Sequence, residues 1–198
     1  MSANHIYLMS LAASGKSTFA ARYPEYAGYR VVDFASKLPR NNPLVLALFY
    51  IVRPFPALQR RARLSPRLNK VGPHYYFDAV TEFMDSAEQP MIVMGRRLRP
   101  QYLESETFRR ARLGIVMIPE ERHRRQCEQR RRELRNFLPW FDHWTTNFDK
   151  VRELRQSLLD YARQHDIEVF ESFEDAVEAL RDNSDNGADP EGATPQTA

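Results

Sequence analysis

Residues 6 to 18, with the sequence IYLMSLAASGKST, decide the fold. The first of them, Ile6 to Met9, are apolar and predict a short buried strand. Gly15, Lys16 and Ser17 come six residues later and open a helical pattern that continues to Arg22. A strand, a loop of small residues, Gly-Lys-Ser and then a helix is the arrangement of a phosphate-binding loop (P-loop).

This loop predicts a nucleotide site. In a P-loop the backbone N–H groups and the start of the helix face the phosphates. The lysine, here Lys16, reaches the terminal phosphates, and the hydroxyl of Ser17 binds Mg²⁺. We therefore expect ATP and Mg²⁺ as cofactors, bound by Ser10, Ala12, Ala13, Ser14, Gly15, Lys16, Ser17 and Thr18. The alternative is a helix that Ser14 caps, with Lys16 in solvent.

One residue departs from the usual pattern Gly-x-x-x-x-Gly-Lys-Ser/Thr. Ser10 stands where the first glycine is expected. Glycine there serves a tight turn, and serine is the next smallest residue that can adapt. The motif is weakened but kept.

Length and composition favour one domain with an insertion. The chain has 198 residues and one cysteine, Cys127, so it forms no intrachain disulfide. Its longest apolar run, Leu44 to Val52, is nine residues and too short to cross a bilayer. No signal-peptide pattern precedes the P-loop. We expect a cytoplasmic protein (in the host cytoplasm, if viral) without a membrane partner.

The net charge of +3 is unevenly distributed. Between Asp33 and Asp78 there is no acidic residue but eight basic ones, and from Gly95 to Arg135 there are thirteen arginines and no lysine. From Asp182 onward there are four acids and no base. Such separation concentrates positive potential where an anionic partner would bind.

The hydrophobic pattern predicts an α/β fold. Apolar stretches indicate five strands, at 6–9, 29–33, 91–94, 113–118 and 167–170. Helical patterns separate them, at 16–22, 75–86, 102–111, 119–137, 147–164 and 173–180. We expect a P-loop NTPase-type three-layer sandwich with a five-stranded parallel sheet over residues 1–182. Proline-rich residues 36–74 would form an inserted helical lobe, and residues 183–198 a disordered acidic tail.

The strand ends favour a kinase over a GTPase or a motor ATPase. Met94-Gly95-Arg96 carries no acid that could align water, and the acids after Ile118 suit the start of a helix. Asp33 ends the second strand, at the edge where parallel sheets build their sites. It could take the proton of an attacking hydroxyl, or it could cap a turn before Ser36.

The order of these segments resembles the P-loop kinases that are similar to nucleoside monophosphate kinases. Residues 115–121 (IVMIPEE), followed by Arg125 and Arg130, are similar to the strand and lid base of adenylate kinases. Residues 168–177 are similar to that family's last strand and helix, near the adenine. The resemblance implies that lid arginines on the helix 119–137 clamp the transferred phosphoryl group, and Arg125 and Arg130 are our candidates. Intrahelical ion pairs are the alternative for several of the thirteen arginines.

The acceptor would bind to basic residues. In this family the inserted lobe holds the acceptor, which makes Arg40 a candidate, and Arg96 follows the third strand where it could hold a phosphate. Eight basic residues, no acid and interleaved aromatic residues suit a polyanion. We therefore expect a hydroxyl on nucleic acid as the acceptor, as in the phage 5-hydroxymethyluracil DNA kinases that modify DNA. A kinase of free deoxynucleoside monophosphates and a nucleotide-gated nucleic-acid-binding module without turnover are the alternatives.

Two other features carry no predicted chemistry. Cys127 lies in the Arg-rich helix and is predicted to pack in the core. The five histidines, among them His123, show no metal-ligand spacing.

Overall fold

A single sheet runs through the part of the chain that the structure describes. The computed structural model describes residues 4–34, 75–137 and 147–182. In these ranges six strands pair in the order β2-β3-β4-β1-β5-β6. The strands are β1 (Ile6–Ser10), β2 (Glu25–Tyr26), β3 (Tyr29–Asp33), β4 (Met91–Gly95), β5 (Arg112–Val116) and β6 (Val169–Phe170). All neighbouring strands are parallel except β2 and β3.

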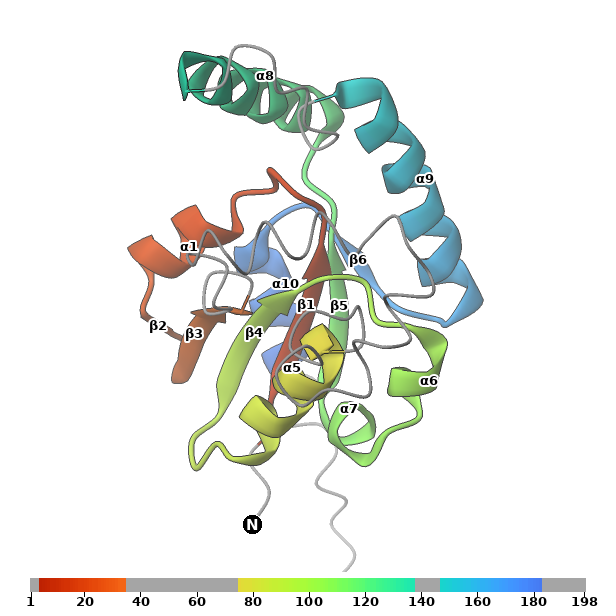
Figure 1. Cartoon of the computed structure of the whole chain (residues 1–198). Coiled ribbons are helices and arrows are strands. Elements are labelled where there is room, and N and C mark those ends of the chain that lie inside the picture. Colours follow the sequence, from red (N-terminus) through yellow and green to blue (C-terminus); the bar gives the residue numbers. More distant parts are fainter. Residues whose placement is uncertain (1–3, 35–74, 138–146, 183–198) are drawn as a thin grey trace, which may run out of the picture.

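Helices cover both faces of this sheet (Figure 1). They are α1 (Lys16–Arg22), α5 (Tyr75–Asp85), α6 (Pro100–Leu103), α7 (Glu106–Arg110), α8 (Glu120–Phe137), α9 (Phe148–Gln164) and α10 (Phe173–Asp182). Helices α1 and α10 contribute to the apolar cluster on one face. Helices α5, α7 and α9 contribute to the cluster on the other face. The three-layer α/β sandwich is therefore confirmed.

The central strand β1 sets the two faces of the core. All five of its residues are buried, as expected for a parallel strand covered on both sides. Tyr7 and Met9 point into one apolar cluster, and Ile6 and Leu8 into the other. The carboxyl end of β1 therefore emerges between two packed layers, and the P-loop starts there.

Two predictions about secondary structure were wrong. The sheet has a sixth strand, β2, between the helix at 16–22 and the strand at 29–33, where no strand was expected; Glu25 and Tyr26 pair antiparallel with the start of β3. The helix expected at 102–111 is two short helices, because Ser105 adopts an extended conformation between them. Its hydroxyl donates to the carbonyl of Tyr102 over 2.7 Å, which ends the first helix.

The other predicted strands and helices in the described ranges are present. The Arg-rich helix expected at about 119–137 is α8, and Figure 1 shows it standing over the carboxyl edge of the sheet beside α9. The predicted lobe 36–74, with Arg40, and the predicted tail 183–198 lie outside the described residues. In the described ranges no helix is both long and apolar enough to span a membrane.

Candidate active site

The P-loop connects β1 to α1 through residues 11–15. Gly15 has φ 91°, in the left-handed region where glycine carries no steric penalty. Ala13 also has a positive φ, of 58°, which is uncommon for a residue with a side chain. Such local strain persists where the surrounding structure holds the backbone in place, as it often does in ligand sites.

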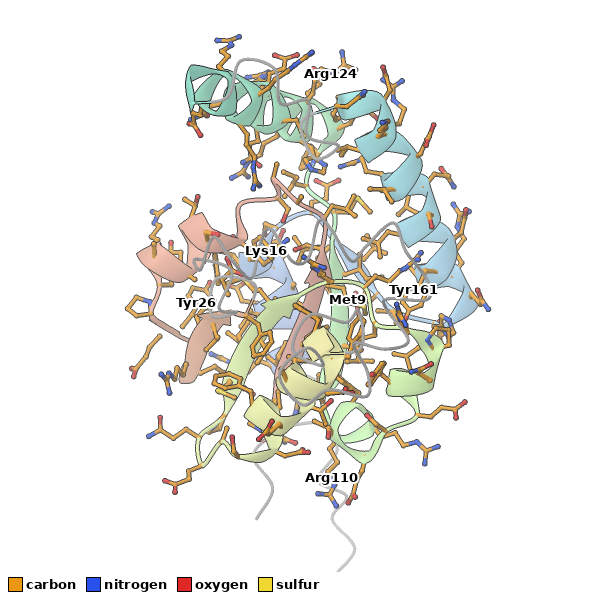
Figure 2. All side chains as sticks on the ribbon, in the orientation of Figure 1. Met9, Lys16, Tyr26, Arg110, Arg124 and Tyr161 are labelled. Carbon is orange, nitrogen blue, oxygen red and sulfur yellow. The ribbon has the colours of Figure 1, made fainter. Side chains whose placement is uncertain are left out.

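The ammonium group of Lys16, a residue labelled in Figure 2, folds back into the loop. Its Nζ donates to the carbonyl oxygens of Leu11 (2.5 Å) and Ser10 (3.2 Å), and to the hydroxyl of Ser10 (3.0 Å). It also lies 3.4 Å from Oγ of Ser14. The alternative in which Lys16 extends into solvent does not occur in this structure.

Several charges converge on Lys16. The pKa of its ammonium is lowered to about 8, chiefly by burial; the charge of Asp33 opposes this shift, and the charges of Arg96 and Arg130 add to it. Arg96 follows β4, Arg130 lies on α8 and Asp33 ends β3, so four elements bring charge to one place. Three cations gathered around one carboxylate have the charge of an anion-binding site.

Ser10 has a defined place at this site, which accounts for its departure from the usual motif. Its φ is not positive, so the position does not need glycine. Its buried hydroxyl accepts hydrogen bonds from Lys16 and, over 3.1 Å, from Oγ of Ser14. Glycine could make neither contact. Position 10 therefore does not need the conformational freedom of glycine, and the serine there supplies a hydrogen-bond acceptor for Lys16.

Ser17 and Asp33 form a pair of oxygen ligands. The exposed Ser17 hydroxyl donates to Oδ2 of the buried Asp33 over 2.6 Å. A hydroxyl and a carboxylate are hard donors of the kind that Mg²⁺ prefers. No group of three or more His, Cys, Asp or Glu side chains in the described ranges could hold a metal. Mg²⁺ typically takes its remaining ligands from phosphates and water, so the pair fits a nucleotide-bound Mg²⁺.

Two buried tyrosines fix the backbone of Arg96. The hydroxyl of Tyr7 donates to the Arg96 carbonyl (2.9 Å), and the Arg96 N–H donates to the hydroxyl of Tyr76 (3.1 Å). The guanidinium of Arg96 lies over the Tyr76 ring, 5.1 Å from its centroid. Arg97 turns instead to α9, where it donates to Oγ of Ser157 over 2.8 Å. Of these two adjacent arginines, Arg96 is the one whose charge lowers the pKa of Lys16.

The two lid candidates lie on different sides of α8. Arg130 is close enough to Lys16 to lower its pKa. Both arginines are exposed, but at 3.6 residues per turn Arg125 stands about 140° around the helix from Arg130. Gln126 lies toward the P-loop, with its Nε2 3.9 Å from where a Cβ on Gly15 would stand. The structure therefore brings Arg130, and not Arg125, to the loop. Thr18 is exposed on α1.

Sequence reasoning missed His123. This side chain is 1% exposed, and its Nε2 lies 2.8 Å from the carbonyl oxygen of Ala12 in the P-loop. A signal was present: His123 stands four residues before Cys127, on the stripe that α8 buries. Cys127 itself is fully buried and its thiol pKa is raised by burial, as expected for a packing residue.

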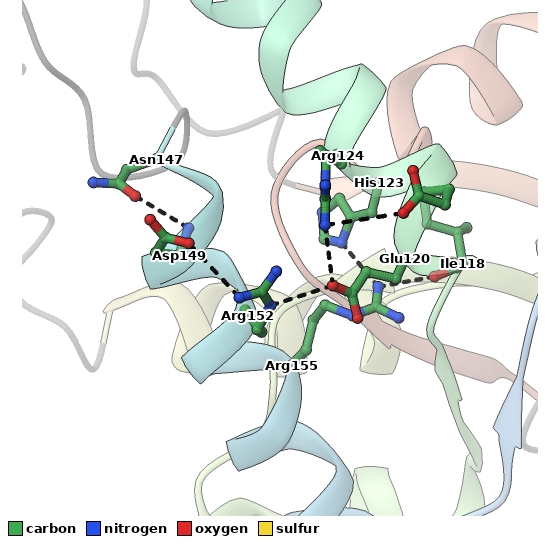
Figure 3. A network of polar contacts seen from close by, with 9 residues as sticks. Ile118, Glu120, His123, Arg124, Asn147, Asp149, Arg152 and Arg155 are labelled. Atoms are coloured by element: carbon green, nitrogen blue, oxygen red, sulfur yellow. Dashed lines mark hydrogen bonds and ion pairs between the residues drawn. The ribbon is translucent and has the colours of Figure 1, made fainter.

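A network of charged side chains joins the start of α8 to α9 (Figure 3). Glu120 pairs with Arg124 on its own helix (3.6 Å) and with Arg152 on α9 (3.2 Å). The side chain of Asn147 caps α9 by accepting from the backbone N–H of Asp149 over 3.1 Å. Arg124 therefore forms intrahelical ion pairs of the kind that the sequence offered as the alternative for several of these arginines.

A groove lies away from these residues. This groove of about 680 Å³ is lined by Asp78, Thr81, Glu82, Asp85, Ser86, Tyr102 and Ser105. It contains none of the predicted site residues and carries negative rather than positive charge. We therefore place the candidate site at the P-loop and not in this groove.

Comparison with known proteins identifies the fold. No family model matches the chain, and no curated protein matches it. Among solved structures it resembles a gluconokinase from Sinorhizobium meliloti 1021, with a TM-score of 0.52 and 15% sequence identity. The match covers 93% of this chain and 95% of that one. The chain thus shares the fold of that gluconokinase.

Proposed function

We propose that this protein is an ATP-dependent phosphotransferase that moves the γ-phosphate of ATP to a hydroxyl group. One observation carries the proposal: the Lys16 ammonium, the Ser17–Asp33 pair and two arginines from separate elements meet at the P-loop. Phosphoryl transfer requires positioning and neutralisation of the charge that spreads over the transferred group. Lys16, Arg96 and Arg130 supply positive charge from three directions.

Each residue then has a distinct task. Ser17 would hold Mg²⁺, which would neutralise charge on the phosphates. Lys16 leaves its contacts with Ser10 and Leu11 to meet the phosphates, because those carbonyl contacts are weaker partners than an anion. Arg130 covers the transferred group from α8.

Asp33 has two candidate roles, as a metal ligand or as a general base, and experiment can separate them. Its contact with Ser17 supports a place on the metal side of the site, and this is the role we propose. The sequence suggested instead that it removes the proton of the acceptor. A metal role predicts that Asp33→Asn raises the Mg²⁺ concentration needed for half-maximal activity. A base role predicts a loss of turnover that excess Mg²⁺ leaves unchanged.

The acceptor we propose is a small molecule that carries both a hydroxyl and a negative charge. Arg96 is the cation that β4 holds at the edge of the sheet, and its fixed backbone suits a bidentate contact to a carboxylate or phosphate. The similar solved structure is a gluconokinase, which is consistent with a small hydroxylated acceptor.

Nucleic acid is the second candidate acceptor. The observation that favours it is the sequence between Asp33 and Asp78, with eight basic residues, no acid and several aromatic residues. The 5-hydroxymethyluracil base in DNA would offer the required hydroxyl. If DNA is the acceptor, its binding should weaken steeply as salt is raised, because several phosphate contacts release counterions.

An acceptor panel tests the proposal. The protein is incubated with γ-labelled ATP, Mg²⁺ and, separately, gluconate, deoxynucleoside monophosphates, plain DNA or 5-hydroxymethyluracil DNA. Label on gluconate supports the small acceptor, and label on modified DNA alone supports the second candidate. Label only on monophosphates would replace the hydroxyl by a phosphate acceptor. Nucleotide binding without transfer to any of them would contradict catalysis and favour a binding module.

A further inference from the structure

We propose that His123, held by Arg155, is a positioning residue that fixes the backbone of the phosphate-binding loop. Three contacts carry the inference. Nε2 of His123 lies 2.8 Å from the Ala12 carbonyl oxygen, and Nη1 of Arg155 lies 3.0 Å from Nδ1 of the same ring. The same Arg155 nitrogen donates to the carbonyl of Ile118 over 2.8 Å, as Figure 3 shows. The inference rests on the proposed function, because it concerns the loop that would hold ATP.

The contacts determine where the imidazole carries its proton. A guanidinium only donates, so Nδ1 of His123 must accept from Arg155. The single proton of the neutral ring then lies on Nε2, which donates to the carbonyl of Ala12. Both contacts are satisfied by this one tautomer and by no other form. A cationic ring would turn a second N–H toward Arg155 and lose that contact.

The surroundings agree with a neutral ring. Burial lowers the pKa of His123, and the positive charges of Arg155 and Lys16 lower it further, against the Ala12 carbonyl. The ring of His123 also lies edge-on to the ring of Phe148 at the start of α9, with 6.2 Å between their centroids. Among the described residues, no carboxylate contributes to this shift.

Holding the Ala12 carbonyl fixes a peptide plane. The carbonyl of Ala12 and the N–H of Ala13 belong to one trans peptide and point in opposite directions. Ala13 has φ 58°, so this plane lies next to a strained residue that could relax by rotating. The His123 contact opposes that rotation and keeps the Ala13 N–H directed away from α8. Arg155 extends the link to α9 and to the end of β5.

Three variants separate positioning from general stability. His123→Leu removes the donor, while His123→Gln retains a side-chain N–H that can reach the Ala12 carbonyl. Arg152→Met is the matched control, because it removes an exposed arginine one turn earlier on α9 that pairs with α8 but does not touch His123. It should behave like the unmodified protein in every measurement below.

Two measurements on the nucleotide-free protein test the inference independently of catalysis. Long-range ¹H–¹⁵N NMR of the unmodified protein at about pH 7.5 should show the neutral tautomer with its proton on Nε2. Amide hydrogen exchange at Ala13 and its neighbours should be faster in His123→Leu and return toward normal in His123→Gln. An Nδ1–H tautomer, a cationic ring, or unchanged exchange in His123→Leu would overturn the inference.

Calorimetric titration with ATP and Mg²⁺ adds the link to function. His123→Leu should raise the dissociation constant about fivefold to tenfold, the value of one hydrogen bond, and His123→Gln should recover most of it. Equal affinity in His123→Leu and the unmodified protein would overturn the inference. If the unmodified protein itself binds no ATP, the proposed function fails, while the tautomer and the exchange rates still decide this inference.

Discussion

Replacing Gly95 by alanine should destabilise the protein and displace Arg96. Gly95 ends β4 and is buried beneath the hydroxyls of Tyr7 and Tyr76. A Cβ at this position would lie 2.6 Å from Oη of Tyr76 and from Cζ of Tyr7, closer than real Cβ atoms come to other heavy atoms. One or both tyrosines must move.

Neither tyrosine can move cheaply. Tyr7 lies in the central strand, is fully buried and packs edge-on against Phe108, with 5.1 Å between centroids. Tyr76 is 5% exposed and packs edge-on against Phe34 and Phe77. Overpacking typically costs about 1–3 kcal/mol, and each lost hydrogen bond about 1 kcal/mol. We expect Gly95→Ala to lower the free energy of unfolding by about 3 kcal/mol and Tm by about 6–12 °C.

Urea unfolding and thermal melts measure this loss, with Gly28→Ala as the matched control. Gly28 has φ 84° and no atom within 4 Å of the added Cβ, so its replacement costs only the strain of the left-handed backbone, about 1–2 kcal/mol. In kinetic assays Gly95→Ala should also raise KM for the acceptor, because both hydrogen bonds that fix the Arg96 backbone are disturbed. If Gly95→Ala proves as stable as Gly28→Ala, Tyr7 and Tyr76 do not hold the backbone of Arg96 as the structure has them.

Three further predictions concern the charged and titratable groups. Asp33→Asn should raise the Mg²⁺ concentration for half-maximal transfer by at least about tenfold, and an unchanged Mg²⁺ titration would refute its metal role. Arg130→Ala should lower kcat by about 100-fold, and Arg125→Ala should cost at least tenfold less, as steady-state kinetics would reveal; similar losses would contradict the orientation of α8. Because the pKa of His123 is lowered in the folded protein, the unfolded chain takes up its proton first as the pH falls below about 6.5. His123 should thus contribute its full stability above that pH and lose it below, so that His123→Gln flattens the dependence of urea stability on pH between about 5 and 7. The difference between the two proteins removes the contribution of His5, whose pKa is also lowered, and parallel pH curves would refute the assignment.

The P-loop and the parallel strands could be predicted because each is a local pattern. Ile6 to Met9 is continuously apolar, and the structure buries it on both sides. Gly15 and Lys16 stand between a strand and a helix, and few other structures require these residues in that place. β2 was missed because a two-residue strand has no periodicity; its pairing with β3 is local, across a tight turn at Ala27 and Gly28.

The arrangement of the site was harder to predict because it depends on side-chain direction across distant elements. The sequence left Asp33 as either a base for the acceptor hydroxyl or a turn cap, and only the fold shows its carboxylate hydrogen-bonded to Ser17. The choice between Arg125 and Arg130 depended on the rotation of α8, which is set by the burial of His123 and Cys127. The buried stripe of α8 is hard to recognise in the sequence because most of the residues around it are exposed arginines.

His123 shows most clearly where the sequence falls short. A lone histidine in a helix of arginines has no metal-ligand pattern and carries no motif. Its role depends on a backbone carbonyl 111 positions earlier and on Arg155 from α9. Contacts of this kind follow from the packing of three elements and not from any one segment.

The most direct test of the central claim is the fate of the labelled γ-phosphate in the unmodified protein and in Lys16→Ala, with the best acceptor from the panel. Circular dichroism would first establish that both proteins are folded. We predict that the unmodified protein transfers the label and that Lys16→Ala lowers kcat by at least about 100-fold with the fold intact. Equal transfer by the two proteins would contradict the assignment of Lys16 and its loop as the site of phosphoryl transfer.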